Sequence, residues 1–208
     1  MASSRSPSTQ NRAWQRMLSG RRLDLLDPSP MDVEIEDIAH GLARVARWNG
    51  QTIGPYAFSV AQHSLVVEQV VRSLKPAISP EMQLAALVHD APEYVVGDMI
   101  SPFKAVLGGD YKAVEARLTR AIHIRFGLPA DLAPSMKKLI KRADLISAWL
   151  ESTQLAGFSA EEAGRFFIQP PEDCHLTLEP QSPGDAQQAF LRRFEDILAE
   201  VDQARGAA

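Results

Sequence analysis

Four ionisable side chains lie close together in the segment LAALVHDAPEYVVGD at residues 84–98. His89 and Asp90 are adjacent, Glu93 follows four residues after the histidine, and Asp98 completes the group. The residues before His89 are apolar, so we expect these groups beside a buried face, where polar side chains are costly unless a partner satisfies them. A metal ion is one such partner, and a buried hydrogen-bond network is the other.

Two further residues are expected to point toward the same region. His63 lies early in a predicted helix over residues 60–74 and shares a side with several valines of that helix. Asp144 lies in the middle of a predicted helix over residues 133–157, with apolar neighbours one turn before and one turn after it. Both side chains are therefore predicted to face the interior.

The ligand chemistry of this group is mixed: His63, His89, Asp90 and Asp144 offer two imidazoles and two carboxylates. Such a set suits one divalent transition metal (Mn, Co, Ni, Fe or Zn) and suits Mg less well. In helical bundles, metal sites are built from inward-facing side chains on facing helices. A bound metal ion lowers the pKa of water to about 7, which favours hydrolysis chemistry. Each of these residues taken alone could equally be a satisfied core group.

Helical periodicity dominates the chain from about residue 31 and predicts an all-α fold. Helices are predicted over residues 31–48, 60–74, 79–97, 108–127, 133–157, 159–167 and 185–203. Pro92 is expected to kink the third of these helices just after the His-Asp pair. The alternating sequence HLTLE at 175–179 predicts an isolated strand. We interpret residues 1–12 as a disordered tail and residues 13–208 as a single domain with a core at about 31–157.

Composition and charge exclude several classes of function. The chain has 208 residues, of which 22 are basic and 26 acidic, so its net charge of -4 gives no electrostatic footprint for nucleic acid. No apolar run approaches the roughly 20 residues of a membrane span. The single cysteine, Cys174, cannot form an intrachain disulfide, which fits a reducing compartment and predicts a cytoplasmic location.

The ordered pattern of His63, His89-Asp90 and Asp144 resembles that of the HD-domain metal-dependent phosphohydrolases. The segments ARVARWNGQ, VAQHSLVV, ALVHDAPEYVVGDMISPFK, YKAVE and IKRADLISAWLE are together similar to the bacterial 5'-deoxynucleotidase branch of that superfamily. The resemblance covers roughly residues 40–157. It implies an HD-domain helical bundle, with N-terminal and C-terminal extensions that do not match, the latter at residues 158–208.

The resemblance also implies roles for individual residues. It makes His63, His89, Asp90 and Asp144 the metal ligands. Glu93 and Asp98 match the catalytic carboxylates, which activate water and protonate the leaving group, although the sequence does not decide which residue does which.

The substrate-binding residues follow from the same resemblance. Arg47 matches the residue that grips phosphate, a task for which a guanidinium fork is suited. Trp48 matches a residue packed near the sugar, where its ring would exclude a 2'-hydroxyl group. Lys104 and Lys112 are secondary candidates for binding phosphate.

These residues predict an enzyme that hydrolyses deoxyribonucleoside 5'-monophosphates to deoxynucleoside and phosphate. One alternative is a dNTP triphosphohydrolase, which would need more basic groups around the pocket. Another is a non-catalytic module that binds a nucleotide and a metal. The family's usual assembly suggests a homodimer, a prediction that the two extensions leave open.

Overall fold

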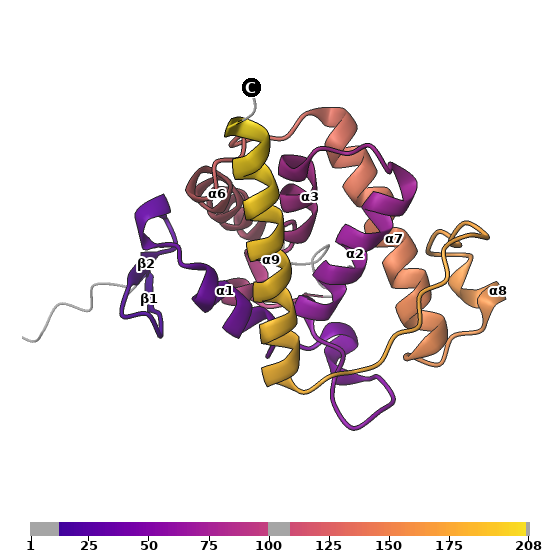
Figure 1. Cartoon of the computed structure of the whole chain (residues 1–208). Coiled ribbons are helices and arrows are strands. Elements are labelled where there is room, and N and C mark those ends of the chain that lie inside the picture. Colours follow the sequence, from indigo (N-terminus) through magenta and orange to yellow (C-terminus); the bar gives the residue numbers. More distant parts are fainter. Residues whose placement is uncertain (1–12, 100–108, 207–208) are drawn as a thin grey trace, which may run out of the picture.

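The computed structural model describes residues 13–99 and 109–206. It is built mostly of helices, so the predicted all-α class is confirmed (Figure 1). The helices are α1 (Ile35–Leu42), α2 (Val60–Leu74), α3 (Pro80–Leu87), α4 (Glu93–Val96), α6 (Gly109–Arg125), α7 (Pro134–Gln154), α8 (Ala160–Ala163) and α9 (Pro183–Gly206). Two short 3-10 helices, η1 and η2, cover Pro30–Asp32 and Arg47–Gly50. Within the described ranges, no helix has both the length and the apolar character that crossing a membrane requires.

Helix α2 lies at the centre of the packing and contacts α3, α7 and α9. Helix α9 runs across α1 and α3 in Figure 1, and its buried residues recur every three or four positions. These residues are Ala186, Phe190, Phe194, Ile197 and Val201. One stripe of α9 therefore completes the core of the same chain. Because this apolar face is buried within the chain, it is not available to a partner. The homodimer stays a prediction.

A buried ion pair also joins α9 to α2. Arg193 donates to both oxygens of Glu68, at 2.8 and 3.2 Å, and to the side-chain oxygen of Gln83 at 2.8 Å. Only 1% of Glu68 is exposed, so its charge needs these donors. The segment after residue 157 is thus tied to the core by polar as well as apolar contacts.

The predicted strand at residues 175–179 is wrong, because the segment pairs with side chains instead of with another strand. Gln154 donates to the Leu176 carbonyl at 2.9 Å and accepts from the Leu178 amide at 3.0 Å. Gln62 does the same for the next part of the chain: it donates to the Glu179 carbonyl at 2.8 Å and accepts from the Gln181 amide at 3.2 Å. Two glutamine amides thus satisfy backbone groups that a neighbouring strand would otherwise have to satisfy.

A short antiparallel hairpin, β1 (Trp14–Arg16) with β2 (Arg22–Asp24), was not predicted. Asp37 of α1 holds its turn by accepting from the backbone amide and the hydroxyl of Ser19, at 3.0 and 2.5 Å. Strands of three residues are too short to show a reliable alternation of apolar and polar side chains. The hairpin lies at one edge of the molecule and α8 at the opposite edge (Figure 1).

The predicted third helix is divided into two helices around His89 and Asp90. Pro92 was expected to kink one continuous helix just after the His-Asp pair, but the helix instead breaks before that pair: α3 ends at Leu87, and α4 covers only Glu93–Val96. Proline has no amide hydrogen to donate to the Val88 carbonyl, which accepts instead from the Ala91 amide at 3.0 Å. His89 and Asp90 therefore lie in a turn between two helices.

Helix α4 is held close to α1 at Gly41. A Cβ atom at position 41 would lie 2.7 Å from the Tyr94 Cβ and 3.0 Å from the Tyr94 carbonyl oxygen, which is closer than packed atoms allow. We expect Gly41→Ala to lower the free energy of unfolding by about 1–3 kcal/mol, because the two helices must move apart. Urea denaturation measures this change.

Gly184→Ala is the matched control for this prediction. The added Cβ in α9 would contact only the Ser182 hydroxyl, at an ordinary 3.8 Å. We expect this control to leave stability unchanged or slightly raised, because alanine favours helix over glycine. Equal unfolding midpoints for the two variants would show that the contact between α1 and α4 is not tight.

Candidate metal centre

The four predicted metal ligands converge in the structure. His63 lies in the first turn of α2, His89 and Asp90 in the turn before α4, and Asp144 in α7. The His63 Nε2 atom lies 3.4 Å from Asp90 Oδ2 and 3.4 Å from Asp144 Oδ1, and the His89 Nε2 atom lies 3.2 Å from Asp90 Oδ2. One ligand atom from each of His63, His89 and Asp90 lies within 4.8 Å of the others. Residues far apart in the sequence thus form one cluster.

Both histidines point their Nε2 atoms toward Asp90, and their Nδ1 atoms are held from the other side. The Nδ1 atom of His63 lies 2.6 Å from Glu151 Oε1, and that of His89 lies 2.9 Å from the Ala86 carbonyl oxygen. A carbonyl and an ionised carboxylate only accept hydrogen bonds, so each Nδ1 carries the hydrogen. The Nε2 atoms remain to bind a cation, which is how metal-binding histidines are usually held.

The donor set fits a transition metal. The Nε2 atoms of His63 and His89 are buried, and although carboxylate oxygens lie 3.2 or 3.4 Å away, none of the described residues makes a well-aligned hydrogen bond to them. Buried polar atoms are normally satisfied, and a cation placed among these nitrogens and the Asp90 oxygen would satisfy them. Two imidazole nitrogens with carboxylate oxygens suit a divalent transition metal.

The electrostatics of the cluster favour a positive charge. Burial acts to raise the pKa of Asp90, but the two histidines outweigh it and hold that pKa well below its usual value. Burial and Arg47 act to lower the pKa of His63, yet Glu151, Asp144 and Asp90 together hold it well above its usual value. Both shifts have the same cause: the carboxylates around the two imidazoles stabilise a positive charge at this position.

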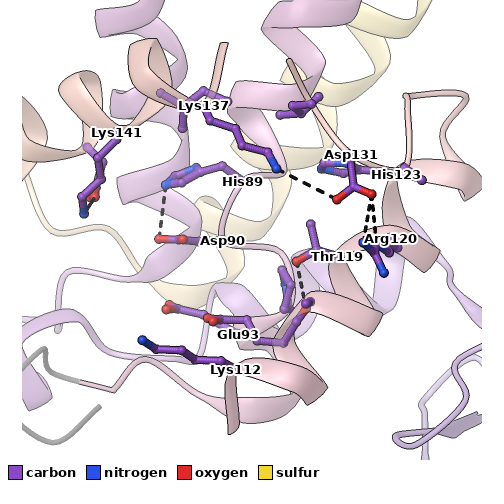
Figure 2. Close-up of a pocket in the computed structure, with 17 residues that line it drawn as sticks. His89, Asp90, Glu93, Lys112, Thr119, Arg120, His123, Asp131, Lys137 and Lys141 are labelled. Atoms are coloured by element: carbon purple, nitrogen blue, oxygen red, sulfur yellow. Dashed lines mark hydrogen bonds and ion pairs between the residues drawn. The ribbon is translucent and has the colours of Figure 1, made fainter. Parts of the chain in front are cut away.

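A cavity of about 410 Å³ opens beside the cluster (Figure 2). His89, Asp90, Glu93 and Asp144 lie on its wall, and Glu93 is only 3% exposed. The basic residues of the wall are Lys112, Arg120, Lys137 and Lys141. The predicted phosphate-binding residue Lys112 therefore lines the cavity, whereas Lys104 lies outside the described residues.

Three other predicted site residues form a neighbouring group. Arg47 Nη1 donates to Asp98 Oδ2 at 3.1 Å, and Arg47 Nε donates to Glu151 Oε2 at 3.1 Å. The indole nitrogen of Trp48 donates to the same Glu151 oxygen at 2.8 Å. Arg47, Trp48 and Asp98 are not part of the described cavity lining. The structure thus brings Asp98 to the arginine, whereas Glu93 lies on the cavity wall, and the catalytic role of Asp98 stays a prediction.

The backbone around Trp48 is unusual. Two backbone bonds, from the Arg47 amide to the Phe58 carbonyl at 2.8 Å and from the Val60 amide to the Val45 carbonyl at 3.0 Å, attach this segment to the start of α2. Trp48 and the next residue both have positive φ, at 56° and 51°. Such φ values are uncommon outside glycine and often occur at functional sites.

The Trp48 ring is fixed by aromatic contacts. It packs against the rings of Phe158 and Phe167, with centroid distances of 5.7 and 5.8 Å. Both phenylalanines follow α7, so the segment after residue 157 also helps to position this side chain. The aromatic contacts and the hydrogen bond to Glu151 together hold the backbone of Trp48 in its strained conformation.

Glu151 is a residue of the candidate site that the sequence did not predict. It is 0% exposed and accepts hydrogen bonds from His63, Arg47, Trp48 and the Ser147 hydroxyl, the last at 2.8 Å. Burial acts to raise its pKa, but Arg47 and His63 outweigh burial and lower the pKa to about 2. A signal was present in the sequence, because Glu151 follows Asp144 by seven residues and so lies on the same side of the helix.

The fold and the cluster define the class: an all-α protein with a His-His-Asp group that could hold a metal ion. The chain is 57% identical to "Uncharacterized protein RCAP_rcc00048" of Rhodobacter capsulatus over 192 residues, which cover 91% of this chain and 98% of the relative. It is 32% identical to "Uncharacterized protein YfdR" of Escherichia coli K12 over 166 residues, or 80% and 85% of the two chains. The chain belongs to the family of these proteins. No protein-family model matches it.

Proposed function

We propose that the protein is a metal-dependent phosphohydrolase of the HD type that hydrolyses deoxyribonucleoside 5'-monophosphates. One observation carries the proposal: two histidines and two aspartates from three separate segments meet beside a cavity whose wall also holds Glu93 and basic side chains. A structural cluster would not need a neighbouring cavity of this size. The proposal places the enzyme in the cytoplasm, where its single cysteine would stay reduced.

The residues divide the chemical work as follows. A bound divalent metal supplies a Lewis acid for phosphoryl oxygens and lowers the pKa of water. Glu93 lies on the cavity wall, where a carboxyl group can move a proton between water and the departing nucleoside oxygen. Arg47 is held between Asp98 and Glu151, so its guanidinium is fixed in direction before a phosphate arrives. Lys112 adds a positive charge to the cavity.

A dNTP triphosphohydrolase remains the second candidate because of the other basic residues around the cavity. Arg120, Lys137 and Lys141 supplement Lys112 on its wall. However, Arg120 and Lys137 both pair with Asp131, at 3.0 and 4.0 Å, and Lys141 pairs with Asp144 at 2.7 Å. These carboxylates already offset much of the added charge, which favours a substrate with a single phosphate.

A reconstitution experiment tests the proposal. The protein is stripped with a chelator, reloaded separately with Mn, Co, Ni, Zn or Mg, and offered dAMP, AMP and dATP. We expect metal-dependent release of phosphate from dAMP and not from AMP, because Trp48 would exclude a 2'-hydroxyl group. Chromatography of the products, with a phosphate assay, measures this.

The other outcomes of the reconstitution are equally distinct. Triphosphate from dATP, with dAMP unchanged, would move the assignment to the triphosphohydrolase. Tight metal binding without turnover of any substrate would favour the binding module and would contradict the proposed chemistry.

A further inference from the structure

We infer that Glu151 is a positioning residue that holds a metal ligand with one carboxylate oxygen and the substrate-side pair Arg47 and Trp48 with the other. The inference rests on the metal site proposed above. Oε1 accepts from His63 Nδ1 at 2.6 Å and from the Ser147 hydroxyl at 2.8 Å. Oε2 accepts from Arg47 Nε at 3.1 Å and from the Trp48 indole at 2.8 Å. A single side chain thus connects the two halves of the site.

The number and kind of donors distinguish this arrangement from an ordinary buried ion pair. A carboxylate has about four acceptor positions, and four donors from four residues occupy them. A structural ion pair with Arg47 would need neither the histidine nor the indole. The short bond to His63 Nδ1 fixes the ring so that Nε2 faces Asp90 and Asp144. Partners of this kind orient metal-binding histidines and strengthen their binding.

The second oxygen of Glu151, Oε2, fixes the two side chains on the substrate side of the site. Trp48 has a strained backbone with φ 56°, and its indole nitrogen is held by Glu151. Arg47 is held by the same oxygen through Nε, while Nη1 pairs with Asp98. The direction of both side chains is therefore set by the same carboxylate that sets the direction of His63.

Glu151→Gln tests this division because glutamine has one acceptor oxygen and one amide that only donates. Arg47 Nε and the Trp48 indole are donors alone, whereas Ser147 Oγ and His63 Nδ1 can each also accept. We expect the glutamine oxygen to face Arg47 and Trp48 and its amide to face His63. The hydrogen of neutral His63 must then move to Nε2, which blocks the nitrogen that would bind the metal.

Two readouts follow that do not depend on turnover. Competition with a chromophoric chelator is expected to show zinc affinity reduced about 10–100-fold, the usual cost of losing a partner of a metal-binding histidine. Nitrogen-15 NMR of the metal-free variant, recorded with His63 neutral, is expected to show its hydrogen on Nε2. The indole N–H signal of Trp48 is expected to stay where it is in the wild type.

Glu68→Gln is the matched control because Glu68 is also a buried glutamate paired with an arginine, Arg193, but lies outside the site. It is expected to lower stability without changing zinc affinity. Wild-type zinc affinity in Glu151→Gln would overturn the inference, and so would a large shift of the Trp48 signal with His63 unchanged.

A measurement on the wild type covers the case in which Glu151→Gln does not fold. In the zinc-loaded protein, the hydrogen on His63 Nδ1 should exchange slowly with water, and a hydrogen on Nε2 or no zinc binding at all would overturn the inference. The inference and the proposed function can also fail separately. A wild type that binds zinc through His63 but hydrolyses no nucleotide would leave the role of Glu151 intact and contradict only the reaction.

Discussion

Replacing Asp90 by asparagine is expected to reduce the affinity for zinc by more than about 100-fold, beyond the usual loss from removing a partner of a metal-binding histidine. Asp90 Oδ2 is the atom that both imidazoles share, at 3.2 Å from His89 Nε2 and 3.4 Å from His63 Nε2. The amide has the same size as the carboxyl group but lacks the negative charge that draws a cation into the cluster. Chelator competition measures the affinity, and phosphate release from dAMP measures the accompanying loss of turnover.

Asp131→Asn is the control for this first variant. Asp131 lines the same cavity, but its side chain is 60% exposed and pairs with Arg120 at 3.0 Å. We expect its replacement to leave zinc affinity unchanged, because an exposed ion pair contributes little and no metal ligand is involved. Equal zinc affinity in the Asp90 and Asp131 variants would show that Asp90 is not a ligand.

The inward direction of two candidate metal ligands could be predicted because each lies in a regular helical pattern. His63 and Asp144 lie on apolar stripes of helices α2 and α7, and the helical period fixes which side faces inward. The structure places His89 and Asp90 beside the other candidate ligands, but the prediction for these two residues used a wrong local structure. It assumed one continuous helix, whereas the two residues lie in the turn that Pro92 imposes.

The links between segments could not be predicted in the same way. Nothing in the local sequence indicates that Glu151 of α7 meets Arg47 and Trp48, because that contact depends on how the segment before α2 returns toward α7. The role of Gln154 in replacing a strand partner for residues 176–178 depends on tertiary packing too. Local periodicity predicts which side of an element is buried, but the partner across the core depends on the whole fold.

The pairing of Asp98 with Arg47 allows the two predicted catalytic carboxylates to be distinguished. Asp98 contacts Arg47 at 3.1 Å, whereas Glu93 lies on the cavity wall next to the candidate ligands. If Arg47 binds phosphate as proposed, a residue that only holds Arg47 affects substrate binding, whereas a residue that moves a proton affects the chemical step. Asp98→Asn is therefore the natural comparison for a change at Glu93.

Glu93→Gln is expected to lower kcat about 10²–10⁴-fold, the usual contribution of general acid–base catalysis, because the amide cannot move the proton. Zinc affinity should stay at the wild-type value, since Glu93 is not one of the four candidate ligands, which meet through contacts of 3.2 and 3.4 Å among His63, His89, Asp90 and Asp144. Steady-state kinetics with dAMP, at a zinc concentration that saturates every variant, separates kcat from KM.

In the same assay, Asp98→Asn should mainly raise KM, because Arg47 loses one of the two carboxylates that hold it. An equal loss of kcat in both variants would instead make Asp98 a second proton-transferring group, and unchanged kcat in Glu93→Gln would contradict its catalytic role.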